Sequence, residues 1–191
     1  QVVKERTGEI MFGLNMVVYK GKTIFVGDTS VHEYPTSKQL SEIAISSARV
    51  FRLFGFDPKV AFVSHSTFGQ PLTSRTKHIK EAVEILKEKK VDFEFDGDMQ
   101  PDVALNEEYK SLYPFSKIVG NANILIMPGQ HSAAISYKMM KTLGDIKVIG
   151  PLLIGLGLPI EIAPLRSSTS EIINLASIAA YSADVINYKK N

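Results

Sequence analysis

Four segments of unusual composition, each with glycine, hydroxyl or amide groups, follow apolar runs in this chain. They lie at 64–69, 97–100, 128–132 and 150–155. If the apolar runs are parallel strands of one sheet, these segments meet at the edge where such sheets bind ligands. Hydroxyls, glycine N–H groups and the N-terminus of a helix beginning at Ser132 would suit an anion such as a phosphate. The alternative is ordinary turn and cap chemistry, because Ser, Thr and Gly are common in any strand-to-helix loop.

The elements that must position these segments alternate between strand and helix patterns. A β-hairpin is expected over 10–26, with its turn at 20–23. Helices are expected where apolar residues recur at helical spacing, over 36–54, 76–90, 132–143 and 168–187. Further strands are expected at 60–63, 91–95, 123–127, 147–149 and 159–163. This alternation predicts an α/β domain with a largely parallel sheet, preceded by the hairpin.

The composition excludes several classes of function. The 191 residues include no cysteine, which rules out disulfides, cysteine–zinc sites and thiol nucleophiles and is typical of a cytoplasmic protein. A formal net charge of +2 is too small to indicate nucleic acid or an anionic membrane as a partner. The four histidines lack metal-ligand spacing, so no metal site is expected. Because the chain begins with Gln1, we expect it to be a piece of a longer protein.

Five segments, in this order along the chain, resemble the phosphate acetyl/butyryl transferase family. They are Ser64–Gly69, Asp96–Asn106, Ala122–Pro128, Ile135–Lys138 and Gly150–Leu156. Within the second segment, the run Asp-Gly-Asp-Met-Gln followed by Asp-Val-Ala-Leu-Asn is similar to the domain fused behind the catalytic domains of bacterial hybrid malic enzymes. The resemblance extends from about Gly8 to Ala183.

The resemblance implies a particular fold and domain organisation. The fold would be three-layer α/β/α with a mainly parallel sheet, of the isocitrate/isopropylmalate dehydrogenase-like kind. Residues 1–163 would form the second domain of the family. Residues 164–191 would hold a C-terminal helix that returns to pack on a first domain, which this chain lacks. Malic-enzyme catalytic domains are expected upstream.

Departures from the family pattern decide which chemistry is expected. Active phosphotransacetylases resemble one another in a Ser-Arg pair before the last helix and an Asp at its start. The aligned positions here hold Pro164, Leu165 and Glu171. Proline has no side-chain donor and leucine has no charge, so neither can activate a thiol or hold a phosphate. Phe68 also replaces a lysine that is common in active members. No catalytic residue is therefore expected in this chain.

The resemblance then implies a regulatory role. The chain would be a non-catalytic, acetyl-CoA-responsive domain of a malic enzyme, which converts malate to pyruvate and CO2. The missing catalytic domain would use NADP or NAD and a divalent metal, Mg or Mn, whereas this fragment would hold no cofactor of its own. The residues expected to bind the effector are Ser64, Ser66, Thr67, Gly69, Gln130, Ser132 and Arg166. The alternatives are an active phosphate acetyltransferase trimmed of its first domain, and a structural assembly domain with an empty cleft.

The expected partners are the chain's own malic-enzyme catalytic domain and further copies of itself, with neither nucleic acid nor a membrane. The last helix is apolar on most of its circumference, and such a helix must be buried on most sides. A homo-oligomer formed through this helix is therefore expected. Ile178 and Ile186 are the positions at which a charge should dissociate it.

Overall fold

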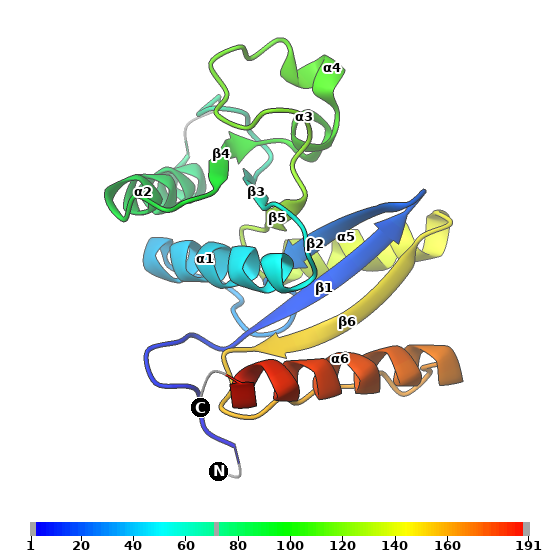
Figure 1. The fold of residues 1–191 in the computed structure, drawn as a ribbon. Coiled ribbons are helices and arrows are strands. Elements are labelled where there is room, and N and C mark those ends of the chain that lie inside the picture. Colours follow the sequence, from blue (N-terminus) through cyan, green and yellow to red (C-terminus); the bar gives the residue numbers. More distant parts are fainter. Residues whose placement is uncertain (1–2, 71–72, 189–191) are drawn as a thin grey trace.

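A six-stranded mixed sheet forms the centre of the structure (Figure 1). The computed structural model describes residues 3–70 and 73–188, and of residues 75 and 184–188 only the backbone. The strand order is β4-β3-β5-β2-β1-β6. The strands are β1 (Phe12–Tyr19), β2 (Lys22–Gly27), β3 (Lys59–Val63), β4 (Glu94–Met99), β5 (Ile124–Ile126) and β6 (Lys147–Ile154). All neighbouring pairs are parallel except the two that include β1, which is antiparallel to both β2 and β6.

The prediction of a largely parallel sheet preceded by a hairpin is therefore wrong in two respects. The sheet is mixed, and the β1–β2 pair does not precede it but lies within it, with β5 on one side and β6 on the other. The physical reason is that β1 is buried on both faces from Phe12 to Val17, so it cannot lie apart from the core. The strand expected at 159–163 is reduced to an isolated bridge between Glu161 and Leu152.

Helices follow most of the strands. They are α1 (Ser37–Leu53), α2 (Ser74–Glu88), α3 (Pro101–Leu105), α4 (Glu107–Lys110), α5 (Gln130–Leu143) and α6 (Thr169–Tyr188). The predicted start of α1 is confirmed, because the Thr36 side chain accepts from the Gln39 N–H and the Gln39 side chain caps Thr36 in return. These caps satisfy N–H groups that a helix otherwise leaves without partners.

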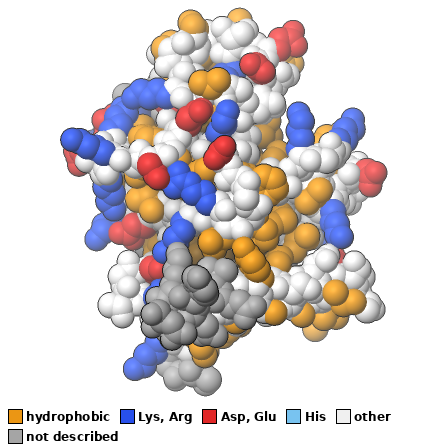
Figure 2. Space-filling model, in the orientation of Figure 1, with side chains coloured by type: hydrophobic (Ala, Val, Ile, Leu, Met, Phe, Trp, Pro, Cys, Tyr) orange, Lys and Arg blue, Asp and Glu red, His pale blue; other side chains and the backbone are white. Residues whose placement is uncertain are grey.

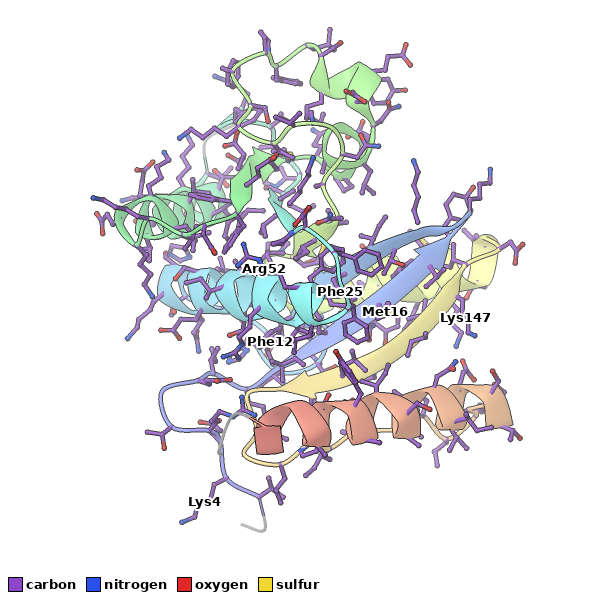
Figure 3. All side chains as sticks on the ribbon, viewed as in Figure 1. Lys4, Phe12, Met16, Phe25, Arg52 and Lys147 are labelled. Atoms are coloured by element: carbon purple, nitrogen blue, oxygen red, sulfur yellow. The ribbon has the colours of Figure 1, made fainter. Side chains whose placement is uncertain are left out.

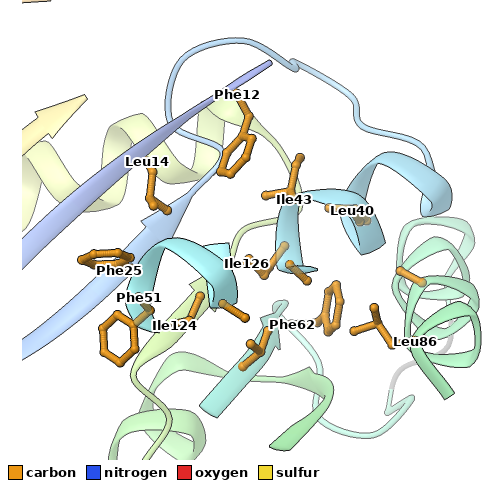
Figure 4. Close-up of a cluster of buried hydrophobic side chains, with 14 of the residues drawn as sticks. Phe12, Leu14, Phe25, Leu40, Ile43, Phe51, Phe62, Leu86, Ile124 and Ile126 are labelled. Atoms are coloured by element: carbon orange, nitrogen blue, oxygen red, sulfur yellow. The ribbon is translucent and has the colours of Figure 1, made fainter. Parts of the chain in front are cut away.

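The two faces of the sheet bury separate clusters of apolar side chains. One cluster joins the strands to α1, α2 and α6, and Figure 4 shows its centre around Phe25, Phe51 and Phe62. Figure 3 shows Phe12 and Phe25 lying between the strands and α1. The rings of Phe25 and Phe51 meet edge to face, 4.8 Å apart. The other cluster joins the opposite face to α3 and α5. Because each large buried side chain contributes about 1.5–3 kcal/mol, these clusters hold the strand ends in place.

Helix α6 packs beside the edge strand β6 (Figure 1). Its Leu175 is only 5% exposed, and the Tyr181 hydroxyl donates to the Leu53 carbonyl at 2.9 Å. The opposite side of the helix stays uncovered, since Ile172 and Ile173 are 50% and 58% exposed. Figure 2 shows hydrophobic side chains exposed at the beginning of this helix and along β6. The predicted contact residue Ile178 is instead partly buried against the core, and the Ile186 side chain lies outside the described residues.

Candidate functional site

The loop after β3 carries three of the hydroxyls that the sequence singled out. Ser64, Ser66 and Thr67 are each at least nine-tenths buried. The Ser64 N–H donates to the Met99 carbonyl at 2.9 Å, which ties the start of the loop to the end of β4. The Ser66 N–H and hydroxyl both lie near the Ser64 oxygen, at 3.4 and 3.3 Å. These hydroxyls therefore hold the loop together at the carboxyl edge of the sheet.

A buried carboxylate at the end of β4 completes this cluster. Asp98 is fully buried, and one of its oxygens accepts a hydrogen bond from the Ser66 hydroxyl. Its other oxygen has no hydrogen-bond partner among the described residues. The sequence had placed the 97–100 segment at this edge but had not assigned Asp98 a role. Because the Ser66 hydroxyl donates to Asp98, its proton is not available to an anion, and this hydroxyl shapes the loop instead.

Thr67 and Gly69 shape the rest of the same loop. The Thr67 hydroxyl oxygen accepts from the Gln100 N–H at 3.2 Å, and the Gln100 side chain donates to the His65 carbonyl at 2.9 Å. Gly69 has φ +84°, a conformation that favours glycine. A Cβ there would also meet the Lys80 ammonium, the end of a flexible side chain that could move away.

Gln130 and Ser132 begin α5, beside the loop after β2. The Gln130 N–H donates to the His32 carbonyl at 2.9 Å, and the Ser132 hydroxyl donates to the Gly129 carbonyl at 2.8 Å. The start of α5 follows β5, and the Ser64 loop follows β3. Because β3 and β5 are parallel neighbours, both lie at the same edge of the sheet. The structure thus brings six of the seven predicted ligand-binding residues to one edge.

Asp28 organises the loop that Gln130 contacts. Its carboxylate accepts from four backbone N–H groups, at 2.8–3.1 Å, and lies 2.7 Å from the Nδ1 of His32. Next to this pair, the Nε2 of His131 lies 2.7 Å from Glu33. No role was predicted for these four residues, since neither pair has a recognisable spacing along the chain.

Arg166 lies elsewhere. It is exposed on the loop before α6, and α6 begins near the start of β6, where Lys141 and Glu171 form an ion pair at 2.8 Å. Since β6 runs in the same direction as β3, its start lies at the opposite edge from the Ser64 loop. Three strands also separate β6 from β3. The structure therefore does not bring Arg166 to the other six residues.

The positions that depart from the family pattern are occupied by structural groups. Leu165 is fully exposed, and Pro164 is exposed beside it. Glu171 caps α6: one of its oxygens accepts from the N–H and the hydroxyl of Ser168, at 2.7 and 3.0 Å. The other oxygen accepts from Lys141, and these donors lower the pKa of Glu171 to about 2. A carboxylate held in this way is a poor proton acceptor near neutral pH.

Phe68 belongs to an aromatic cluster. Its ring centre lies 5.5 Å from that of Tyr113 and 4.8 Å from that of Phe115. These contacts accommodate a phenylalanine at a position where the family resemblance leads us to expect a lysine.

A cavity of about 360 Å³ lies between the N-terminal segment, α1, the end of β6 with the segment after it, and α6. It is lined by Leu153–Gly155 of the segment at 150–155, which was expected to be an edge loop but is mostly strand β6. Its wall is mostly apolar and includes Val50, Leu53, Leu153, Leu156 and Leu158. Its charged wall residues are Arg6, Glu9, Arg49 and Glu161. The sequence predicted neither the cavity nor its charged residues.

The fold and the edge loops define an α/β domain of phosphotransacetylase architecture. A phosphotransacetylase from Streptococcus pyogenes superposes with a TM-score of 0.89 at 32% identity, over 96% of this chain and 57% of that protein. The phosphate acetyl/butaryl transferase family matches residues 1–180. The chain therefore belongs to the phosphate acetyl/butyryl transferase family, and the predicted membership is confirmed.

Two kinds of relative are similar over almost the whole chain. An NADP-dependent malic enzyme from Rhizobium meliloti (strain 1021) is 44% identical over 95% of this chain. A phosphate acetyltransferase from Bacillus subtilis (strain 168) is 32% identical over 96% of it. The chain spans 24% of that malic enzyme and 57% of that acetyltransferase. These lengths agree with a phosphotransacetylase-like domain within a malic enzyme.

Among residues 3–70 and 73–188, no helix combines the length and apolar character that crossing a membrane requires. The same part of the chain holds no group of three or more His, Asp or Glu residues arranged to bind a metal ion.

Proposed function

We propose that this chain is the acetyl-CoA-responsive regulatory and oligomerisation domain of a malic enzyme, and that it catalyses no reaction itself. The whole protein would oxidise and decarboxylate malate to pyruvate and CO2 in its own catalytic domain. That domain would supply NADP or NAD and a divalent Mg or Mn ion. The similarity to the Rhizobium meliloti enzyme supports this assignment. We further propose a cytoplasmic location, an isocitrate/isopropylmalate dehydrogenase-like fold, and a division into residues 1–163 and 164–191.

The observation that carries the proposal is the start of α6. Pro164 and Leu165 stand where active members have Ser and Arg, and both are exposed and unable to hold a thiol or a phosphate. Glu171 stands at the position of the family's Asp, and its carboxylate oxygens already accept hydrogen bonds from the Ser168 N–H and from Lys141. A transferase would need these groups free and facing the reacting atoms.

The effector would bind along the carboxyl edge of the sheet. Gln130 and Ser132 are partly exposed there and can contact a ligand, whereas Ser64, Ser66 and Thr67 are buried and shape the loop behind it. The backbone N–H groups at the start of α5 suit an anionic group of acetyl-CoA. Arg166 would contribute only in a contact with another domain or copy, because it lies at the opposite edge.

The test is malate oxidation by the full-length protein with and without acetyl-CoA. We expect the rate to change, and we expect the double variant Gln130→Ala/Ser132→Ala to lose most of the response while keeping the rate without effector. Thr142→Ala, an exposed change at the other end of α5, serves as the matched control. A response that is unchanged in the double variant would contradict the assigned site, and no response in the wild type would contradict the regulatory role.

The alternative function is an active phosphate acetyltransferase. The 32% identity to the Bacillus subtilis enzyme favours it, although the chain spans only 57% of that enzyme. Assaying the full-length protein for acetyl phosphate formation from acetyl-CoA and phosphate separates the two. We expect no activity above background. Turnover of about 1 s⁻¹ or faster, the lower end of the typical range for enzymes, would establish the alternative.

A further inference from the structure

The cavity between the N-terminal segment, α1 and α6 has the size and wall chemistry of a small-molecule site. Its volume of about 360 Å³ lies within the usual range for ligand pockets. Most of its wall is hydrocarbon, from residues such as Val50, Leu153, Leu156 and Leu158. Such a wall favours an apolar ligand body, while a few charged groups set its orientation.

The charged part of the wall holds two guanidinium groups, Arg6 and Arg49, and two carboxyl groups, Glu9 and Glu161. Glu9 accepts two hydrogen bonds from the Arg49 guanidinium, at 2.8 and 2.7 Å, and one from Arg6 at 3.3 Å. One carboxylate thus serves two guanidinium groups. The Arg6 side chain is 38% exposed and keeps N–H donors that Glu9 does not use. These N–H groups can donate hydrogen bonds to an anionic head group.

Glu161 is the other acidic residue of the wall, and the wall carries a net positive charge only while the Glu161 carboxyl is neutral. Burial raises the pKa of Glu161 to about 7, against a weaker opposing hydrogen bond from the Leu153 N–H. The charged groups that share the cavity with it are Arg6, Glu9 and Arg49, and no histidine is among the described residues that line it. Below about pH 7 the Glu161 carboxyl is therefore mostly neutral and can donate a hydrogen bond.

We propose that this cavity binds an aliphatic monocarboxylate of medium chain length. The carboxylate would pair with Arg6, and the hydrocarbon chain would lie against Leu153, Leu156 and Leu158. A neutral ligand of the same length would leave the guanidinium donors unpaired, and a cationic one would be repelled. The site shares no residue with the proposed effector site, so the two proposals stand or fall separately.

The first experiment titrates the 191-residue chain with sodium octanoate by isothermal titration calorimetry near pH 6. We expect one saturable site with a Kd below about 1 mM, and at least about tenfold weaker binding of 1-octanol. Leu158→Trp should fill the cavity and abolish octanoate binding. Leu112→Trp, on an exposed residue after α4, is the matched control and should leave the Kd unchanged. Thermal unfolding of each variant without ligand shows whether it is folded.

Two further variants test the head-group contact. Arg6→Gln should weaken octanoate binding about tenfold, as expected for losing one charge-assisted pair, and should leave 1-octanol unaffected. Lys38→Gln, an exposed lysine outside the cavity, should have no effect. Because ionised Glu161 repels the ligand, octanoate should bind several-fold more weakly at about pH 8.5 than at about pH 6, and Glu161→Gln should remove this dependence.

Several results would overturn the proposal. Octanoate and 1-octanol binding equally well would show that the head group is not recognised. Octanoate binding that survives Leu158→Trp would place the ligand elsewhere on the protein. The absence of saturable binding at about ten times the expected Kd would show that the cavity does not take this class of ligand.

Discussion

Changing Ile172 and Ile173 to Asp should dissociate the homo-oligomer that we propose. These side chains are 50% and 58% exposed on the side of α6 that faces away from the sheet. Fully burying an isoleucine contributes about 1.5–3 kcal/mol, so covering the exposed half of each contributes about 1 kcal/mol. In a two-fold dimer four such side chains are covered, which amounts to about 4 kcal/mol, or about a thousandfold in Kd.

The double variant should fold as the wild type does. Leu175, which is 5% exposed, is unchanged and still anchors the helix to the sheet. Asp near the beginning of a helix also interacts favourably with the helix dipole. Ile178, which the sequence indicated as a position for such a charge, is unsuitable. Its side chain is partly buried against the core, and a charge there would unfold the helix.

Sedimentation velocity at tens of micromolar is the assay. We expect the wild type to sediment as an oligomer and the double variant as a monomer with an unchanged far-UV circular dichroism spectrum. Leu112→Asp is the matched control, since Leu112 is 74% exposed but lies after α4, away from α6. A monomeric wild type, or an oligomer that dissociates only in the Leu112→Asp variant, would refute the reasoning.

Three further predictions concern stability. Leu175→Ala should lower the free energy of unfolding by about 2–4 kcal/mol in urea denaturation, because it leaves a cavity beneath α6, and an Ile173→Ala control should lower it by less than about 1 kcal/mol. Asp28→Ala should lower the free energy of unfolding by about 3 kcal/mol or more, since four backbone N–H groups lose their acceptor. Unchanged hydrogen exchange of the backbone amides at 30–32 would contradict this. The raised pKa of Glu161 means that the folded state binds the proton of this carboxyl more tightly than the unfolded state does. The free energy of unfolding of the wild type should therefore fall by about 2 kcal/mol as pH rises from about 4.5 to about 7. This loss should be absent in Glu161→Gln.

Local patterns along the chain predicted the helices well. The capping pair Thr36 and Gln39 and the apolar spacing that follows them specify α1 through contacts within a few residues. The same reasoning predicted the two strands of the β1–β2 pair. It could not predict where that pair lies in the sheet, because the pairing of β1 with β6 joins residues more than a hundred positions apart.

The candidate site was predicted in position more than in detail. Ser66 lies at the expected edge of the sheet, but its hydroxyl is taken by Asp98, a partner 32 positions away that no spacing reveals. The resemblance implied that Arg166 lies at the site together with these loops. The direction of β6 places it at the opposite edge, and strand direction is a property of the whole sheet. Glu161 was missed because its burial arises only where three distant segments meet.

In the non-catalytic role that we propose, the start of α6 would keep the family's scaffold without its chemistry. A general base needs a free carboxylate with a pKa near the working pH. Glu171 is instead fixed by the N–H and hydroxyl of Ser168 and by Lys141, and these donors stabilise its ionised form. The ion pair between Lys141 and Glu171 joins α5 to the start of α6. Ile172 and Ile173 follow Glu171 directly, so the contacts that hold this carboxylate also fix the exposed side chains through which we propose that copies assemble.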